Sequence, residues 1–328
     1  MKGLSFEFPL LGRCILYFPS DSLATFISRQ LKNYVIETTD VFCDDCEMEI
    51  FNSEIFELLK KFIKNNLYYS RSFKVDKSVI LLDNIEYKCT GKSLKIKYKH
   101  SNSIDHKIKW IIKSIMCINS IMEYRNNSGI FYARYLFPLL SIYAAYYGYY
   151  CIHGSLIRLK NKNIVLTGLD GVGKSTMANM LSSEEGEILS DNIVLFNGIT
   201  ALNFNLAMRI DLDTETKYQT IFKLNKFKEV LPDVTTFGEV VVDSFYNLIR
   251  DRNNRIPYLK EASFSPTSWA LYLNTAPEIG QANKLMAPWS YVWASGMRDD
   301  KAPQLQICNL FIPENGIQEA KEIIINEC

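Results

Sequence analysis

The chain has 328 residues, 48% of them hydrophobic and 22% charged, a composition that suits a soluble globular protein of two domains. Its formal net charge of +1 argues against a bulk electrostatic grip on nucleic acid or on an acidic membrane surface, so we expect neither as a partner. The eight cysteines are scattered without framework spacing, which indicates the reducing environment of the cytoplasm.

The N-terminal part, residues 1–128, is expected to form a smaller α+β domain. Residues 34–42, 77–89 and 93–100 alternate or run apolar in the manner of strands. Residues 53–66 have the spacing of a helix. These elements predict a separate domain ahead of the rest of the chain.

A long amphipathic helix is expected over residues 106–124 because its isoleucines recur on one face. The polar stretch 125–129 ends this helix. We therefore place a domain boundary there and expect a second domain over residues 129–328.

Two features of the N-terminal half have plain interpretations. Cys43 and Cys46 form a lone C-x-x-C, and no second such pair or nearby histidine completes a zinc site, so we expect two ordinary thiols. The apolar residues 136–152 fall short of the roughly 20 that a membrane span needs. They predict a buried, aromatic-rich helix.

The stretch GLDGVGKST, residues 168–176, fits the pattern G-x-x-x-x-G-K-[ST] of a loop whose backbone amides wrap the phosphates of a nucleotide. Its glycines let the backbone approach phosphate oxygens without a Cβ in the way. The lysine of the pattern reaches the β and γ phosphates, and the serine ligates Mg²⁺. The predicted nucleotide-binding residues are Gly168, Asp170, Gly171, Val172, Gly173, Lys174, Ser175 and Thr176.

Asp170 is the unusual member of this loop, because a carboxylate that faces a triphosphate is repelled. We expect it to point to solvent or to a metal-bound water.

The flanks of the loop indicate its place in the fold. Residues 163–167 are typical of a short buried strand, and apolar residues at helical spacing follow the loop, which therefore opens onto a helix N-terminus. Upstream, residues 149–159 predict another strand, with a turn at 160–163. The strand that feeds the loop is thus expected to be the second arm of a hairpin.

Residues 152–210, with IHGSLIRLKNKNIVLTGLDGVGKST followed by GEILSDNIVLF, resemble the catalytic domain of the HPr kinase/phosphorylase family and of HPr-kinase-like enzymes found beside peptide biosynthesis genes. That group is related in fold to ATP-dependent phosphoenolpyruvate carboxykinase. The resemblance implies an α/β fold in which a P-loop catalytic domain with a mixed sheet follows the smaller α+β domain. No comparable match is found in residues 1–125, and the C-terminal third does not look like the usual family tail.

Phosphoryl transfer also needs a carboxylate, and Asp191 is the first candidate. It ends a short apolar strand one helix after Lys174, so it can return beside the loop. By resemblance it is the first member of the family's acidic pair, which makes Ser175 and Asp191 the predicted metal ligands. The alternative is an aspartate that caps a turn.

Asn192 stands where the family usually has a second acid, and an amide cannot accept a proton. Either Asp191 takes both roles or the chain has lost catalysis. Asp243 is the rival acid, because it follows an apolar stretch in the way of a magnesium-water ligand in ordinary P-loop nucleotidases. Such short patterns are common in buried strands.

His153 and Arg209 complete the predicted catalytic set with Lys174 and Asp191. His153 resembles the strand histidine of the family, and the alternative is a satisfied core group. Arg209 lies where related kinases carry a phosphate-facing arginine, and the alternative is a surface ion pair with an aspartate nearby.

Further along, Arg298 and the run 250–255 are cations that either close over a triphosphate or form a solvated face. A cluster of aromatic residues either shapes an acceptor pocket or belongs to the core. Its members are Trp269, Trp289, Tyr291 and Trp293.

We interpret the chain as a cytoplasmic kinase that uses ATP and Mg²⁺ to phosphorylate a Ser or Thr hydroxyl of a peptide or small protein, as the resemblance implies, in peptide natural-product biosynthesis. Residues 1–128 then serve in recognition of the acceptor. A small-molecule kinase that acts on a metabolite stays open, as does a non-catalytic ATP-binding regulatory or assembly subunit. A homo-oligomer stays open as well.

Overall fold

The computed structural model has a mixed α/β architecture with several sheets. It describes residues 2–8, 12–17, 21–32, 34–40, 47–51, 55–57, 60, 73–75, 77–82, 85–98, 124, 127–128, 131, 136, 140, 147, 149–169, 171–203, 206–224, 227–232, 238–262 and 307–328. The described residues up to Tyr147 belong to one compact unit, and those from Tyr149 onward belong to a second.

The first unit contains an eight-stranded antiparallel sheet. Its strands follow the spatial order β3 (Val35–Asp40), β1 (Lys2–Phe8), β2 (Gly12–Tyr17), β4 (Glu47–Ile50), β8 (Ser93–Tyr98), β7 (Ile85–Thr90), β6 (Val79–Leu82) and β5 (Phe73–Val75). Helix α1 (Asp21–Gln30) packs against β1. Leu4 and Phe6 of the strand and Phe26 and Ile27 of the helix are all buried, so this contact forms part of an apolar core.

The strands expected over 34–42 and 93–100 are confirmed as β3 and β8. The single strand expected over 77–89 is wrong, because β6 and β7 pair antiparallel with Leu82 opposite Ile85. In the sequence, the turn-favouring residues Asp83 and Asn84 interrupt the apolar run between these two strands. Most of 58–66, residues 106–123 and the pair Cys43 and Cys46 lie outside the described residues.

The second unit is built on a six-stranded mixed sheet, as expected for this part of the chain. Its strands follow the order β12 (Glu187–Ser190), β10 (Gly154–Leu159), β11 (Lys162–Gly168), β19 (Ser244–Arg250), β21 (Ile307–Ile312) and β20 (Tyr258–Ala262). Strands β11, β19 and β21 are parallel to one another. Strand β10 is antiparallel to both its neighbours, and β20 is antiparallel to β21.

The expected hairpin ahead of the glycine-rich motif is confirmed as β10 and β11. Its turn consists of Lys160 and Asn161, with φ of 46° and 69°, the pair of positive values found in type I′ turns. It is shorter than the expected 160–163, because Lys162 and Asn163 already pair within the hairpin. The upstream strand is also interrupted, since β9 (Tyr150–Ile152) ends before His153 and joins another sheet.

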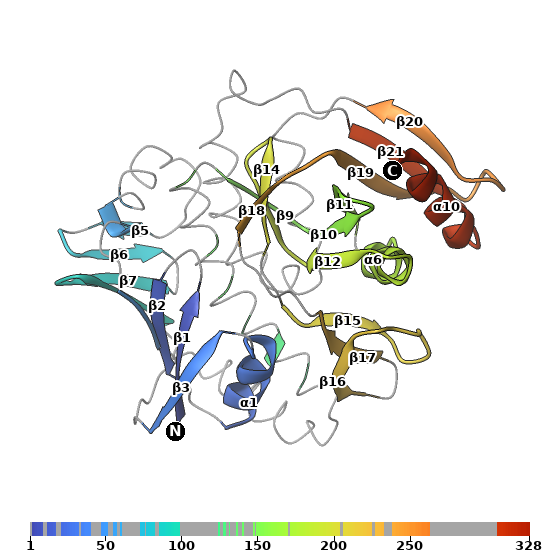
Figure 1. Cartoon of the computed structure of the whole chain (residues 1–328). Helices are drawn as coiled ribbons and strands as arrows, with labels where there is room; N and C mark the ends of the chain where they lie inside the picture. The colour runs from blue at the N-terminus through green and yellow to red at the C-terminus, as the bar shows by residue number, and fades with distance from the viewer. Residues whose placement is uncertain are drawn as a thin grey trace. The chain divides into compact units, whose positions relative to one another are not determined.

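That other sheet is antiparallel, with the order β18 (Gly238–Val241), β14 (Thr200–Asn203), β13 (Val194–Phe196) and β9. Figure 1 shows α6 (Lys174–Ser183) and α10 (Ile317–Glu327) on one side of the six-stranded sheet and β9, β14 and β18 on the other. The burial pattern agrees, because Ile164 and Leu166 of β11 join the core with the helices while Val165 joins the core with the second sheet. This unit therefore has a helix layer and two sheet layers.

A three-stranded sheet, with the order β15 (Met208–Asp211), β17 (Phe227–Leu231) and β16 (Gln219–Lys223), completes the second unit. Met208, Ile210 and Val230 bury their side chains in the core with the helices. Of the helix expected over 136–152, the last three residues are the strand β9, and most of the others lie outside the described residues. No helix in the described part of the chain has the length and hydropathy to cross a membrane.

Candidate functional site

The glycine-rich loop, defined here as residues 168–173, connects β11 with α6. Gly168, Gly171 and Gly173 have φ of 143°, 73° and 104°, values that side chains with a Cβ rarely adopt. A Cβ at Gly168 would lie 2.5 Å from the carbonyl oxygen of Leu248 in β19, whereas one at Gly171 would meet nothing within 4 Å. The loop is thus tightly packed at its base and open at its tip. Asp170 lies outside the described residues.

Helix α6 begins directly after this loop, with Gly173 as its N-cap and no side chain that caps it. The first amides of a helix have no acceptor within the helix, and the helix dipole places partial positive charge there. The first turn also carries no acidic residue. Val172 is buried against the helix core, and Thr176 is half-buried in the first turn. This end of α6 is suited to an anion.

Lys174 lies against the loop. Its Nζ donates to the carbonyl oxygens of Gly168 and Leu169 at 3.1 Å each, and its side chain is buried. The ammonium group of Lys174 therefore lies against the backbone of the glycine-rich loop.

Asp191 follows β12 and reaches the first turn of α6. Ser175 Oγ donates to its Oδ2 at 3.0 Å, and Ser155 Oγ of β10 donates to its Oδ1. The carboxyl group is buried, and burial raises its pKa although these hydrogen bonds act in the opposite direction. Asp191 therefore sits beside Ser175, one hydrogen bond from the start of the helix.

Asn192 helps to fix this carboxylate with its main chain. Its φ of 67° lies in the left-handed region that asparagine tolerates, and its backbone amide donates to Asp191. Its carbonyl oxygen accepts from Gly154 N at 3.3 Å. The turn after β12 is thereby tied to the beginning of β10.

His153 lies between β9 and β10 and is buried. Its carbonyl oxygen accepts from Thr167 Oγ1 at 3.0 Å, while its Nδ1 has no hydrogen-bond partner among the described residues. Burial, together with the positive charges of Lys174 and Arg209, lowers the pKa of His153 to about 3. The imidazole is therefore neutral near pH 7 and close to two cations.

Arg209 is exposed on β15, and its guanidinium lies 5.4 Å from the centre of the Phe227 ring of the neighbouring β17. Its charge reaches His153, as the lowered pKa of that histidine indicates.

Asp243 lies at the other end of the sheet. It precedes β19, and its Oδ2 accepts from Asn163 N at 2.7 Å at the beginning of β11. Ser244 pairs near the start of β11 and Leu248 pairs with Gly168 at its end. At about 3.3 Å per residue, Asp243 is roughly 15 Å from the glycine-rich loop. The expected strand before it, β18, is at the end of its sheet's described strand order, and only Val240 of its side chains is partly buried. Asp243 therefore lies away from the glycine-rich loop, whereas Asp191 lies beside Ser175.

Two parts of this neighbourhood were not foreseen. Ser155 was not singled out, although it stands two residues after His153 on the hairpin arm that pairs with β11, and this proximity was the available signal. The sequence does not distinguish the arginines of the run 250–255, whereas the structure places Arg250 and Arg252 in the lining of one cavity with Gly171 of the loop. Arg298 and the group Trp269, Trp289, Tyr291 and Trp293 lie outside the described residues.

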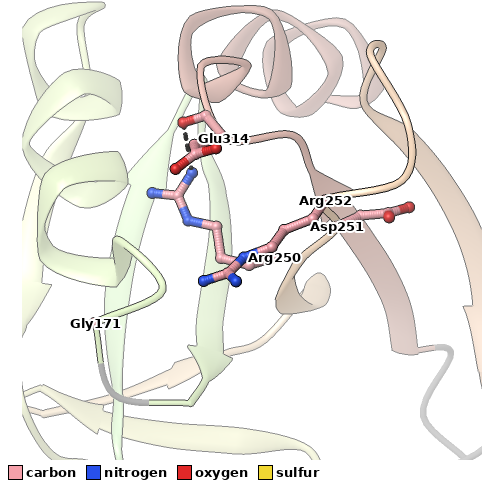
Figure 2. Close-up of a pocket in the computed structure, with 5 residues that line it drawn as sticks. All are labelled: Gly171, Arg250, Asp251, Arg252 and Glu314. Carbon is pink, nitrogen blue, oxygen red and sulfur yellow. Dashed lines mark hydrogen bonds between the residues drawn. The ribbon is translucent and has the colours of Figure 1, made fainter.

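A cavity of about 300 Å³ opens between the glycine-rich loop and the end of β19. Gly171, Arg250, Asp251, Arg252 and Glu314 line it (Figure 2). Over the described ranges, no group of three or more His, Cys, Asp and Glu side chains is placed to hold a metal ion. The oxygen pair of Ser175 and Asp191 is the candidate metal position.

No family model and no curated protein matches the chain. Among solved structures, the HPr(Ser) kinase/phosphatase from Coxiella burnetii matches with 10% sequence identity and a TM-score of 0.25, over 54% of this chain and 95% of that chain. A likeness this distant identifies neither an activity nor a set of site residues. The functional conclusion therefore depends on the residues around the glycine-rich loop.

Proposed function

We propose that this chain is a kinase that uses ATP and Mg²⁺ to transfer the γ-phosphate to a Ser or Thr hydroxyl of a peptide or small protein. One observation carries the proposal. A buried carboxylate, Asp191, and the hydroxyl of Ser175 meet at 3.0 Å at the uncapped N-terminus of α6, beside the buried ammonium group of Lys174. Phosphoryl transfer requires this combination of anion binding, metal ligands and a carboxylate.

The glycine-rich loop fits a polyphosphate. Its tip is open at Gly171, and the helix that follows has no side-chain cap and no acid in its first turn. Lys174 donates to two loop carbonyls, and phosphate oxygens are stronger acceptors for the same ammonium group. We infer that Gly171, Val172, Gly173, Lys174, Ser175 and Thr176 hold the phosphates of ATP.

Ser175 and Asp191 fit Mg²⁺, which prefers oxygen ligands and usually keeps several waters beside one or two carboxylates. One carboxylate and one hydroxyl at 3.0 Å from each other form such an incomplete shell. When bound, the ion would neutralise negative charge on the phosphates.

The same carboxylate is our candidate for the acceptor's proton. Its carboxylate can accept a proton, whereas the neighbouring amide of Asn192 cannot. The hydrogen bond from Ser155 fixes the direction of Oδ1, and the neutral His153 supplies a second hydrogen-bonding group nearby. Lys174 and Arg209 supply positive charge on the same side.

The peptide acceptor, the role in peptide natural-product biosynthesis and the cytoplasmic location follow from the sequence resemblance alone. The sheet of the first unit is compatible with a peptide, because β3 and β5 are at the two ends of its described strand order and an extended peptide can pair with an edge strand.

The test is a γ-phosphate transfer assay with radiolabelled ATP, screened against peptides and small proteins from neighbouring genes. The same assay is run with Lys174→Ala. We expect transfer by the unaltered chain and none by the variant. An unchanged signal in Lys174→Ala would remove the proposed mechanism.

The second candidate is a regulatory or assembly subunit that binds ATP without transferring phosphate. Asn192 supports it, because the residue beside Asp191 is an amide and cannot share the work of a base. ATP binding with no transfer to any peptide, protein or metabolite would favour this candidate. Transfer gained in Asn192→Asp would show that the second acid is the missing part.

A further inference from the structure

Two arginines that are not among the catalytic residues proposed above line the cavity beside the glycine-rich loop. Arg250 is the last residue of β19, and Arg252 follows it by two positions. Figure 2 shows both guanidinium groups directed toward the side of the cavity that carries Gly171, while the carboxylate of Asp251 points away. The cavity is therefore lined by cations on the side opposite to the loop.

The strand register explains why Arg250 is there. Leu248 pairs with Gly168, where β11 ends, so β19 continues past the base of the loop. Leu248 is buried in the core with α6, and side chains two residues apart on a strand share a face. Arg250 consequently lies on the helix side of the sheet, and its Nη2 is 3.5 Å from the position that a Cβ of Gly173 would occupy.

Arg250 is held in this position by the chain after β21. Its Nη1 donates to the carbonyl oxygens of Pro313 and Glu314 at 3.1 and 3.2 Å. These bonds orient the guanidinium group so that its other nitrogen faces the N-terminus of α6. An arginine held in this way loses little conformational entropy when it binds a ligand.

Arg252 is exposed and has no ion pair with the described residues. The adjacent acid does not neutralise it, because Asp251 accepts from Asn253 N at 2.9 Å and from Asn254 Nδ2 at 2.6 Å on the other side of the chain. Glu314, which is also exposed, is the remaining acid along the cavity. The side chains that face the cavity therefore leave an excess of positive charge.

We propose that Arg250 and Arg252 form an anion subsite that binds a phosphate group adjacent to the one held by the glycine-rich loop. Planar guanidinium groups match phosphate oxygens in pairs, and about 300 Å³ is at the lower end of the size range of ligand pockets. The phosphate belongs either to the nucleotide or to a second ligand. Binding of a nucleotide phosphate rests on the proposed function, whereas binding of a phosphate from a second ligand does not.

The experiment measures binding by calorimetry with the full chain and two ligand series. The first series is MgADP and MgATP, and the second is inorganic phosphate. Arg252→Gln is the main variant, because Arg252 is exposed and forms no ion pair with the described residues. Arg250→Gln is the second, and its folding is checked by circular dichroism because Arg250 anchors the chain after β21. Arg255→Gln is the matched control, since Arg255 is an exposed arginine of the same run that does not line the cavity.

A nucleotide phosphate in the subsite predicts that Arg252→Gln weakens MgATP or MgADP binding about tenfold, the loss of one charge-assisted hydrogen bond, while Arg255→Gln does not. A phosphate of a second ligand predicts unchanged nucleotide binding and a comparable loss of inorganic phosphate binding. Both results support the subsite. Equal affinities of Arg252→Gln, folded Arg250→Gln and Arg255→Gln for all three ligands would overturn it.

The two proposals fail separately. If the unaltered chain binds no nucleotide, the kinase proposal is lost, but inorganic phosphate still tests the subsite. Suppose instead that nucleotide binding depends on Lys174 while substitution of Arg250 and Arg252 leaves the affinities for nucleotide and for inorganic phosphate unchanged. In that case the subsite proposal is wrong and the kinase proposal stands.

Discussion

Ser175 Oγ donates a hydrogen bond to Asp191 Oδ2 at 3.0 Å, although helix α6 and strand β12 separate the two residues in the chain. The carboxylate is buried there together with a second donor, Ser155. The contact between the buried Asp191 and Ser175, the residue after Lys174, is the central feature of the proposed site, and substitution of Asp191 tests it directly.

We expect Asp191→Asn to lower phosphoryl transfer by at least about 100-fold, because the amide cannot accept a proton and is a poorer Mg²⁺ ligand. The rate of transfer is measured with saturating MgATP. Asp243→Asn is the matched comparison, since it makes the same change at the far end of β11, where the amide oxygen can still accept from Asn163 N. Loss of transfer in Asp243→Asn alone would exchange the roles given to the two acids.

We expect Gly168→Ala to destabilise the fold. Its φ of 143° is unfavourable for alanine, and the new Cβ would lie 2.5 Å from the carbonyl oxygen of Leu248. The free energy of unfolding should fall by roughly 1–3 kcal/mol, as measured by urea denaturation. In Gly238→Ala the new Cβ meets nothing within 4 Å, so that control should change stability little. Equal stabilities of the two variants would show that the base of the loop is not tightly packed.

We expect Glu185→Gly to stabilise the protein by about 1 kcal/mol, because Glu185 follows the end of α6 with a φ of 65° and glycine adopts this conformation without a Cβ penalty. Thermal unfolding measures the change. Glu185→Ala keeps the Cβ and should gain little. A gain of the same size in Glu185→Ala would point to the removed charge instead of the backbone.

We expect the stability of the unaltered chain to depend on His153 between pH 6.5 and about 3. Burial lowers the pKa of this histidine to about 3 in the folded state, so the unfolded chain binds the proton more readily in that range. The neutral form favours folding fully above pH 6.5, and this contribution is lost as the pH falls toward 3. Urea denaturation at pH 7.5 and pH 5 should show a smaller loss of stability in His153→Gln than in the unaltered chain. A parallel loss in both would contradict the burial of a neutral imidazole.

The parts of the site that are local in sequence could be predicted. The strand, the loop glycines and the apolar face of α6 lie within two dozen residues, and the hairpin of β10 and β11 follows from a polar turn between two apolar runs. The position of Asp191 near the loop could also be predicted, because a single helix and a single short strand connect the loop with this residue.

The rest depends on pairings between distant segments. Arg250 reaches the loop because β19 aligns with β11 across nearly eighty residues, and no local pattern encodes that register. The same alignment places Asp243 at the wrong end of the sheet, although its apolar prefix looked suitable. The antiparallel pairing of β6 with β7 is hard to predict for another reason, since apolar residues surround the two polar residues that separate these strands in the sequence.

The hydrogen bonds of Asp243 affect the position of Arg250 at the other end of β19. Its backbone N donates to the carbonyl oxygen of Asn163 at 2.9 Å, and its carboxylate accepts from the backbone N of the same residue, so it clamps β19 to β11 where the two strands begin. A slip of one residue would turn every side chain of β19 to the opposite face. The guanidinium of Arg250 would then leave the helix layer. The hydrogen bonds of Asp243 at one end of β11 thereby help to determine which side chain of β19 stands beside Gly173 at the other end.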